Sequence, residues 1–324
     1  MKPRISKTKI YVAMSGGVDS SVAAALLKKE GHHVTGVFMK PWQPYDEREV
    51  CLWKQDREDA MRVASQLNIP FKTWDFSREY KREVTDYMIR EYKAGRTPNP
   101  DVMCNKEIKF GLFLKKALRE GAEYIATGHY VRLKKQGTEY HLLKGKDLNK
   151  DQSYFLWTLD QRILKHCLFP IGGYTKPEVR KLAKKFGLSV YDKKDSQGVC
   201  FIGPLNMKEF LTRYIKPNKG KILDQAGKVI GVHDGIYYYT IGQRHGLNIG
   251  DGQGPYYVTG KDVKKNIIFV GPNSDTRQKE ARVANIHWVN GEISLPGNID
   301  IKVRYRTKSV RATLKKNGDL VFKR

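Results

Sequence analysis

The stretch of this sequence best suited to chemistry is the segment 14–21, which reads MSGGVDSS. Two adjacent glycines allow the backbone to turn sharply and approach an anion closely, and the serine hydroxyls add hydrogen-bond donors. An apolar run at 9–13 precedes the segment and a helical pattern at 18–29 follows it, so the segment lies between a strand and a helix N-terminus. The partial positive charge of such a helix end favours phosphate. The pattern therefore predicts a nucleotide-phosphate loop.

Asp19 is an acidic residue inside this loop and needs a reason of its own. A carboxylate beside polyphosphate is repelled unless it binds Mg²⁺ or caps the helix, and we favour the positioning of Mg²⁺ over the cap. The loop has neither a Walker-A pattern ending in Gly-Lys-Ser/Thr nor GxGxxG. A purely structural strand-to-helix turn is the alternative interpretation of the whole segment.

The elements that must position this loop alternate between strands and helices. The sequence predicts strands at 34–39, 71–76 and 124–130, and helices at 56–67, 78–92 and 106–119. This alternation is typical of a doubly wound parallel sheet, whose ligands bind beyond the carboxyl ends of the strands. The nucleotide loop and Met39 would both lie there.

A second stretch suited to chemistry is 95–105, which reads GRTPNPDVMCN. Its prolines and asparagines predict a shaped loop that ends with Cys104, just before the helix predicted at 106–119. A thiol at a helix N-terminus, flanked by Lys106 and Lys109, is expected to ionise easily and to be reactive. The alternative is a small buried hydrophobic side chain, a common role of cysteine.

Three further segments carry candidate site residues. The turn 127–129 (TGH) ends the strand predicted at 124–130. Its glycine can admit an adenine or a ribose, while its histidine is expected to be a structural hydrogen-bonding group. After a hairpin predicted at 131–144, the polar tetrad 150–153 (KDQS) is placed to meet phosphate or a base edge, and the aromatic run behind it is expected to be core. A helix at 176–187 then leads to 195–203 (DSQGVCFIG), a loop with a cysteine between glycines.

The charge of the chain points to a polyanionic partner. Its 60 lysines and arginines against 34 acidic residues give a net charge of +26 in 324 residues, and the isoelectric point is near 9.8. Neutralising phosphates releases counterions and drives association with nucleic acid. A generally lysine-rich proteome or a need for solubility is the alternative.

Composition also bounds the class of protein. A hydrophobic content of 40% indicates a folded chain. The sequence has no run of about 18 apolar residues, so it predicts no membrane span. The basic N-terminus lacks the apolar core of a secretory signal, so we expect a cytoplasmic protein without a membrane partner. Cysteines at 51, 104, 167 and 200 include no CxxC pair, which argues against a disulfide scaffold or a zinc knuckle.

The character of the sequence changes near residue 206. A helix at 207–214 is followed by glycine-punctuated strands at 220–232, 237–240, 256–259 and 266–270. We therefore expect three domains, at 1–204, 205–275 and 276–324. The last also reads as strands, and alternation within a strand would put Lys302, Arg304, Arg306 and Lys308 on one face as a basic stripe.

Taken together, these motifs resemble the tRNA-specific 2-thiouridylases of the PP-loop ATP pyrophosphatase superfamily. The motifs are AMSGGVDSS at 13–21, FMK at 38–40, TPNPDVMCNKEIKFG at 97–111, ATGHY at 126–130, KDQSYFL at 150–156, SQGVCFIG at 196–203, TIGQRHGL at 240–247 and VRYR at 303–306. They span nearly the whole chain, and two cysteines in these contexts are specific to this family. The resemblance implies an α/β fold: a doubly wound parallel-sheet PP-loop ATPase domain, a small β-rich central module and a C-terminal β-barrel-like domain.

The resemblance also implies a reaction, the ATP-dependent 2-thiolation of uridine 34 in tRNAs for Lys, Glu and Gln. ATP with Mg²⁺ adenylates the C2 oxygen, and sulfur from a cysteine desulfurase or a relay protein replaces it. Cys200 would carry the persulfide, Cys104 would be its partner thiol and Asp101 a general acid or base. Direct attack by the persulfide and attack by released sulfide both stay open. An iron–sulfur cluster on the two cysteines is a disfavoured alternative, because two thiols are fewer than such clusters usually take.

The same resemblance implies binding residues. For ATP they are Ala13, Met14, Ser15, Gly16, Gly17, Val18, Asp19, Ser20, Met39 and Gly128. For the target base and the tRNA they are Asn99, Pro100, Asp101, Lys150, Asp151, Gln152, Arg306 and Thr307.

The sequence departs from the family pattern in two places. Thr307 stands where many members have histidine, and the chain stops at Arg324 where members generally continue. We therefore expect a shortened C-terminal domain, with tRNA affinity affected more than catalysis. A PP-loop synthetase acting on another substrate and a non-catalytic tRNA-binding homologue are the rival hypotheses.

Overall fold

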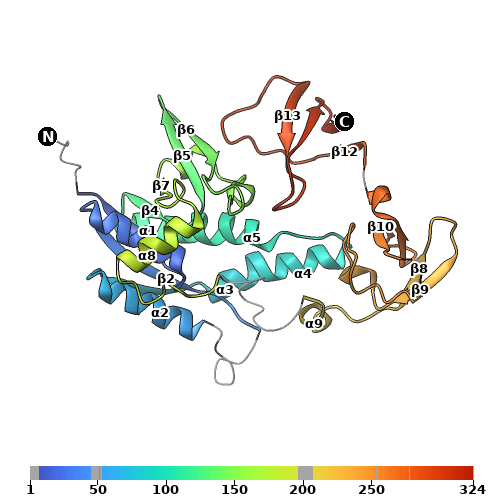
Figure 1. Cartoon of the computed structure of the whole chain (residues 1–324), viewed down its shortest axis with the longest axis horizontal. Helices are drawn as coiled ribbons and strands as arrows, with labels where there is room; N and C mark the ends of the chain where they lie inside the picture. Colours follow the sequence, from blue (N-terminus) through green and yellow to red (C-terminus); the bar gives the residue numbers. More distant parts are fainter. Residues whose placement is uncertain are drawn as a thin grey trace.

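The computed structural model describes residues 7–44, 51, 53–195, 207–250, 252, 254–276 and 278–323. Along the chain, an α/β domain with a parallel sheet is followed by two β-rich parts (Figure 1). The domain boundaries expected near residues 204 and 275 fall between these parts and stay predictions. Within the described residues, no helix is long and apolar enough to cross a membrane.

The central sheet has five parallel strands in the order β3-β2-β1-β4-β7. Their bounds are Lys9–Ala13 for β1, His33–Lys40 for β2, Phe71–Asp75 for β3, Tyr124–Ala126 for β4 and Cys167–Leu168 for β7. Strand β1 pairs with β2 on one side and with β4 on the other, so the chain reverses its winding direction beside β1. A ligand site is expected at such a switch point.

Alternate residues of β1 face opposite sides of the sheet, and both sides are covered. Ile10 and Val12 belong to a core formed with α1 (Val18–Lys29), α2 (Lys54–Gln66) and α8 (Lys176–Lys185). Tyr11 and Ala13 belong to a second core, formed with the helical segments between residues 77 and 119. The predicted doubly wound α/β domain is therefore confirmed.

A continuous helical rod covers the second face. It consists of α5 (Pro100–Met103), a π-helical segment η2 (Cys104–Phe113) and α6 (Leu114–Arg119). The prediction of a loop through residue 105 is therefore wrong beyond Asn99. The Asn99 side chain accepts a hydrogen bond from the Val102 backbone N–H at 3.3 Å, and Pro100 occupies the first turn, which is a standard helix start. Cys104 consequently lies one turn inside the helix and not at its N-terminus.

The remaining helical prediction in this domain, at 78–92, is confirmed with an irregular centre. The segment forms α3 (Ser77–Tyr80), a π-helical stretch η1 (Lys81–Thr85) and α4 (Asp86–Lys93). The predicted hairpin is also present, as β5 (Val131–Gln136) and β6 (Glu139–Lys144). The aromatic run that follows is only partly core, because Leu156 is buried whereas Trp157 is 46% exposed.

The central module begins with α9 (Met207–Thr212) and contains a four-stranded sheet in the order β10-β11-β8-β9. The strands are β8 (Gly220–Leu223), β9 (Val229–His233), β10 (Tyr257–Asp262) and β11 (Ile267–Gly271). The strand predicted at 237–240 is wrong, because Ile236–Tyr238 forms a 3₁₀ turn, η4. That turn buries Ile236, and the Tyr238 hydroxyl donates to the Ile215 carbonyl at 2.5 Å.

The C-terminal part is a four-stranded antiparallel sheet in the order β12-β15-β14-β13. Its strands are β12 (Glu280–Arg282), β13 (Gly297–Ile301), β14 (Val310–Leu314) and β15 (Asp319–Phe322). Residues 302–309 form a loop, so the basic stripe expected from strand alternation is wrong. Arg306 has a φ of 63°, and the Thr307 hydroxyl donates to the Arg304 carbonyl at 2.6 Å, which makes a turn where a strand was predicted.

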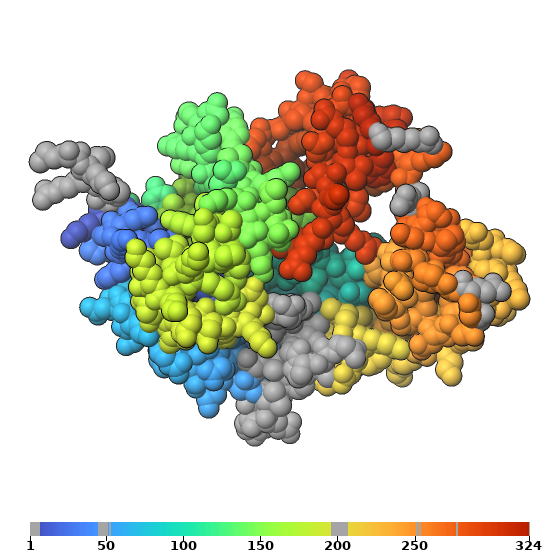
Figure 2. Space-filling view, in the orientation of Figure 1, coloured from blue at the N-terminus to red at the C-terminus, as the bar shows by residue number. Residues whose placement is uncertain are grey.

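The loop 302–309 docks onto the α/β domain. The ring of Tyr305 lies 4.6 Å from that of Phe155, and the Tyr154 hydroxyl donates to the Val303 carbonyl at 3.2 Å. Arg304 donates to the Ile241 carbonyl, which belongs to the central module. Figure 2 shows the C-terminal part, in red, lying between the green hairpin region and the orange central module. The loop thus contacts both other parts of the chain.

Candidate active site

A cavity of about 410 Å³ lies at the carboxyl end of the parallel sheet. It is lined by the residues at the ends of three neighbouring strands, β1, β2 and β4, as expected for a site at the switch point. Of the residues predicted to bind ATP, those on its wall are Ala13, Met14, Ser15, Asp19, Ser20, Met39 and Gly128. Gly16, Gly17 and Val18 belong to the same loop but are not among the lining residues.

The loop 14–21 has the backbone geometry of an anion cradle. Gly16 has a φ of 75°, and a Cβ atom there would lie 2.1 Å from the Asp56 carbonyl oxygen, so only glycine fits. The Ser15 backbone N–H donates to the Ser20 hydroxyl at 3.2 Å, which closes the loop. Gly17 is the N-cap of α1, and within the described residues this helix start has no side-chain cap. The first N–H groups of α1 therefore suit an anionic ligand.

The turn after β4 passes directly against this loop. A Cβ atom on Gly128 would lie 2.6 Å from the Ser20 backbone nitrogen, so a larger residue would displace the start of α1. His129 beside it is buried, and its Nδ1 lies 2.7 Å from the Thr127 hydroxyl oxygen. Burial lowers the pKa of His129 well below its usual value, so the ring is neutral at pH 7. This matches its expected role as a structural hydrogen-bonding group.

Asp101 and Cys104 line the same cavity as the nucleotide loop. They come from successive turns at the start of the helical rod, which points both side chains toward the sheet end. Asp101 as a whole is exposed to solvent, but its carboxyl group is partly buried in the cavity wall. This burial raises the pKa of Asp101, and the positive charge of Lys109 partly opposes the rise. Cys104 is buried. Cys200, the predicted persulfide carrier, lies outside the described residues.

Asp19 is held by partners that the sequence did not suggest. Its two carboxylate oxygens lie 2.8 and 2.9 Å from the Lys176 Nζ, and the Tyr130 hydroxyl donates to Oδ1 at 2.7 Å. The carboxylate is therefore committed to a lysine, and the helix-cap alternative also fails because α1 has no side-chain cap within the described residues.

These residues do not fit a Mg²⁺ site built on Asp19. Both of its oxygens accept hydrogen bonds from protein groups, and the neighbouring Asp56 forms an ion pair with Lys193 at 2.7 Å. Across the described ranges, no group of three or more His, Cys, Asp or Glu side chains is arranged to hold a metal ion. The prediction of a Mg²⁺-positioning role for Asp19 is accordingly not supported by its surroundings. The iron–sulfur alternative depends on Cys200 and stays untested.

The predicted tRNA-contacting tetrad faces inward in this structure. Lys150 forms an ion pair with Asp195 at 2.6 Å. Asp151 is buried and accepts hydrogen bonds from the Gly145 N–H and the Ser153 hydroxyl, both at 3.0 Å. Gln152 accepts from the Tyr130 N–H at 2.9 Å and lines the nucleotide cavity. Contact of these residues with tRNA stays a prediction.

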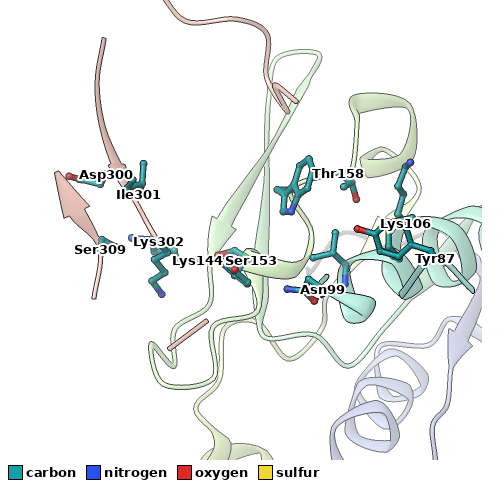
Figure 3. Close-up of a pocket in the computed structure, with 14 residues that line it drawn as sticks. Tyr87, Asn99, Lys106, Lys144, Ser153, Thr158, Asp300, Ile301, Lys302 and Ser309 are labelled. Atoms are coloured by element: carbon teal, nitrogen blue, oxygen red, sulfur yellow. Dashed lines mark hydrogen bonds between the residues drawn. The ribbon is translucent and has the colours of Figure 1, made fainter. Parts of the chain in front are cut away.

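A second cavity, of about 710 Å³, separates the α/β domain from the C-terminal sheet. Figure 3 shows Lys302 and Ser309 of the C-terminal part on one side and Asn99 and Lys106 of the helical rod on the other. Asn99 is thus the one predicted base-contacting residue on the wall of this cavity. Pro100, Arg306 and Thr307 do not line it among the described residues, and the Arg306 guanidinium lies over the Tyr305 ring at 5.3 Å.

Two lysines near the nucleotide loop had no signal in the sequence. They are Lys176, which contacts Asp19, and Lys193. The Lys193 Nζ donates to the Gly16 carbonyl at 3.1 Å and to Asp56 and Asp59 at 2.7 and 2.6 Å. Both lie more than 150 residues beyond the loop that they hold, and neither is part of a local motif. A short-range pattern could not have identified them.

Comparisons with known proteins cover nearly the whole chain. Residues 8–204 match the family model described as tRNA methyl transferase HUP domain, and residues 208–272 match the model described as tRNA methyl transferase PRC-barrel domain. The tRNA-specific 2-thiouridylase MnmA of Listeria monocytogenes serotype 4b is 48% identical over 97% of this chain and 86% of its own length. The tRNA-specific 2-thiouridylase MnmA 2 of Geobacillus kaustophilus is 47% identical over 95% of this chain and 84% of its own length.

Solved structures give a weaker likeness. The NMN synthetase of Francisella tularensis aligns with 63% of this chain and 72% of its own at 15% identity, with a TM-score of 0.38.

Proposed function

The chain belongs to the family of tRNA-specific 2-thiouridylases, and on this premise we propose that it replaces the C2 oxygen of uridine 34 with sulfur in tRNAs for Lys, Glu and Gln. One observation carries this proposal. A single cavity is lined by part of the nucleotide loop, by Asp101 and by Cys104, so a bound nucleotide, an acid or base and a thiol would meet at one place. These are the groups that activation and thiolation of a carbonyl-type oxygen require.

The first step would be activation of the oxygen. Uracil O2 is a poor leaving group, so it must first be adenylated. It attacks the α-phosphate of ATP, which is supplied as its magnesium complex, and pyrophosphate leaves. The uracil N3 proton must be lost as O2 becomes nucleophilic. Asp101 is our candidate for its acceptor, because a carboxyl with a raised pKa is closer to the range in which proton transfer is efficient.

The second step would be the attack of sulfur on C2. The outer sulfur of a persulfide on Cys200 forms the C–S bond, and AMP leaves with the former O2. The Cys104 thiolate then attacks the Cys200 sulfur, which breaks the S–S bond, releases the thiolated base and leaves a Cys104–Cys200 disulfide. In the alternative order, Cys104 first frees sulfide from the persulfide, and sulfide attacks C2. Either order needs a two-electron thiol reductant for another turnover.

Binding of the tRNA would use the cavity between the α/β domain and the C-terminal sheet. Lys106, Lys144 and Lys302 line it, together with the aromatic side chains Tyr154 and Trp157. Lysines suit backbone phosphates, and aromatic rings suit the unstacked bases of an anticodon loop. Uridine 34 has to leave its stack to reach the nucleotide cavity. The two cavities adjoin in the sequence at this point, because Tyr154 lines the first and the next residue, Phe155, lines the nucleotide cavity. A cysteine desulfurase or a relay protein would supply the sulfur.

The test is sulfur incorporation into unmodified tRNA-Glu with MgATP and a cysteine desulfurase. We expect thiolated uridine 34 with the unaltered chain and none with Cys200→Ser or Cys104→Ser. Cys51→Ser is the matched control, because Cys51 is partly exposed and lines neither cavity, and it should retain activity. Supplying free sulfide to Cys200→Ser tests whether sulfide can attack the adenylated base without a persulfide on Cys200.

Two outcomes would overturn the proposal. A chain that binds tRNA but neither consumes ATP nor thiolates the base is a non-catalytic tRNA-binding homologue. A chain that releases pyrophosphate with a small substrate, and without tRNA, is a PP-loop synthetase of another kind.

A further inference from the structure

The ion pair between Asp19 and Lys176 lies directly behind the wall of the nucleotide cavity. Asp19 lines the cavity and Lys176 does not, so the lysine approaches the carboxylate from the protein side. The Lys176 side chain is only 11% exposed, which is unusual for lysine and requires a compensating partner. The residues are 157 positions apart, and the packing of α8 against α1 brings them together.

The pair is itself held on both sides. The Tyr130 hydroxyl donates to Asp19 Oδ1 at 2.7 Å, and Lys176 also contacts Asp195 at 2.7 Å. Asp195 is in turn bound by Lys150 at 2.6 Å and by Arg180 at 3.1 Å. With these partners, both the direction of the Asp19 carboxylate and the place of the lysine charge are fixed.

Charge explains why such an arrangement is needed at a phosphate site. The loop has no lysine of the Walker-A kind, and it contributes a carboxylate to the wall on which a triphosphate would lie. An uncompensated carboxylate there would repel the ligand strongly, because charges interact more strongly near a protein interior than in water. The single ammonium group of Lys176 contacts both oxygens of this carboxylate and opposes that repulsion.

We propose that Lys176 is a positioning residue of the nucleotide site, which orients and neutralises Asp19 so that the loop can accept the triphosphate of ATP. The inference rests on the proposed function only in taking ATP as the ligand. It assigns Asp19 to a lysine instead of to Mg²⁺, and it gives the helix α8 a role in nucleotide binding that the helix pattern did not suggest.

The test is a double-mutant cycle on MgATP binding, measured by isothermal titration calorimetry on the full chain. Lys176→Met should weaken binding about tenfold or more, because it leaves the carboxylate unpaired. Asp19→Asn alone should have a much smaller effect. The double variant should bind ATP about as well as Asp19→Asn, since the Asp19 charge is then absent and Asp195 keeps Lys150 and Arg180. Lys176→Arg should retain most of the affinity.

The same helix offers a matched control. Lys146 pairs with Glu178 of α8 at 2.8 Å on the surface, so Lys146→Met removes a lysine–carboxylate pair that does not contact the nucleotide loop. Its affinity for MgATP should equal that of the unaltered chain. Thermal unfolding of every variant identifies loss of folding, and if Lys176→Met is unfolded, Lys176→Gln and the double variant complete the cycle.

Three results would overturn the inference. One is a Lys176→Met variant, folded, that binds MgATP normally. Another is an equal loss of affinity with and without Asp19→Asn, which would make Lys176 a direct phosphate ligand. The third is a rise in the free Mg²⁺ needed for half-maximal binding in Asp19→Asn, which would return Asp19 to the metal. If the unaltered chain binds no ATP at all, the proposed function fails together with the inference.

Discussion

Two loops that line cavities of this protein are built differently. The nucleotide loop at 14–21 is fixed by backbone geometry, by hydrogen bonds within itself and by lysines that reach it from the interior. The loop 302–309 is exposed, with Val303 at 62%, and it is held by side chains that cross from one part of the chain to another. The first is preformed by its own domain, while the second depends on docking.

This difference predicts which property each loop controls. A loop fixed from within its domain gives nucleotide affinity that should not depend on tRNA. A loop held by a few exposed contacts is of low local stability, so it can adjust when a large ligand enters the neighbouring cavity. Substitutions in the first should therefore abolish ATP binding, and substitutions in the second should change tRNA affinity alone.

The largest effect is expected from Gly128→Ala. The new Cβ atom would lie 2.6 Å from the Ser20 backbone nitrogen, and backbone cannot move aside as a side chain can. Displacing the start of α1 should cost about 1–3 kcal/mol of stability and should remove MgATP binding in calorimetry. Gly173→Ala is the matched control, because nothing lies within 4 Å of its Cβ position. Normal ATP affinity in Gly128→Ala would show that the nucleotide loop is not preformed.

The next effect in size is expected from Tyr305→Ala. The variant loses the ring contacts with Phe155 and Tyr154, whose centroids lie 4.6 and 6.2 Å away. An aromatic contact of this kind is worth about 1 kcal/mol, or roughly fivefold in an equilibrium constant. We therefore expect about a fivefold rise in KM for tRNA, measured by thiolation rates, with MgATP affinity unchanged.

Tyr305→Phe is the control for that prediction. It keeps the ring, and no hydrogen bond of the Tyr305 hydroxyl is recorded among the described residues, so its kinetics should match those of the unaltered chain. A change in ATP affinity in Tyr305→Ala would contradict the separation of the two loops.

The same contrast explains what the sequence could predict. Strand β1 and helix α1 have the predicted bounds, because an apolar run, two glycines and a helical apolar pattern are all local signals. The alternation of strands and helices predicts a parallel sheet with its site beyond the carboxyl ends of the strands, while the strand order that places the switch point beside β1 comes from the structure. Of the predicted site residues, Asp101 and Cys104 line the same cavity as Ser15, Asp19 and Ser20 of the nucleotide loop.

Other features depended on contacts that no local pattern records. The Asp19–Lys176 pair joins residues 157 positions apart, whereas the local sequence around Asp19 alone predicts a Mg²⁺ role for its carboxylate. The segment 302–309 alternates as a strand would, but the packing of Tyr305 on Phe155 and the turn at Arg306 prevail. The start of the helix at Pro100 differs from these cases, because Asn99 and Pro100 form a local helix-start signal that the sequence does contain.

A smaller effect, with a defined sign, is expected for the stability of Asp101→Asn. Burial raises the pKa of Asp101 in the folded chain above its unfolded value of about 3.9. At neutral pH the folded state therefore bears the cost of an unfavourably placed charge. Below the unfolded pKa the group is protonated in both states, and that cost is absent.

Replacing Asp101 by asparagine should thus raise the free energy of unfolding at pH 7, and this gain should shrink as the pH falls toward 4. Urea unfolding of both proteins at the two pH values measures it. A gain that does not change with pH, or a loss at pH 7, would contradict the prediction. A gain at pH 7 would show that the α/β domain holds the Asp101 carboxylate in an unfavourable environment, as expected of a site that its own domain preforms.

The smallest effect is expected where the α/β domain touches the central module. The hydroxyls of Thr97 and Thr240 lie 2.9 Å apart in an exposed position, and one donates to the other. A hydrogen bond between neutral groups at a surface contributes about 0.5–1 kcal/mol at most, and water replaces it readily. Thr97→Val and Thr240→Val should each change the free energy of unfolding by less than that, and ATP and tRNA affinities should stay within about twofold. If either variant instead lost tRNA affinity as strongly as Tyr305→Ala, the docking that controls tRNA binding would extend to the central module, and the loop 302–309 would be only one part of it.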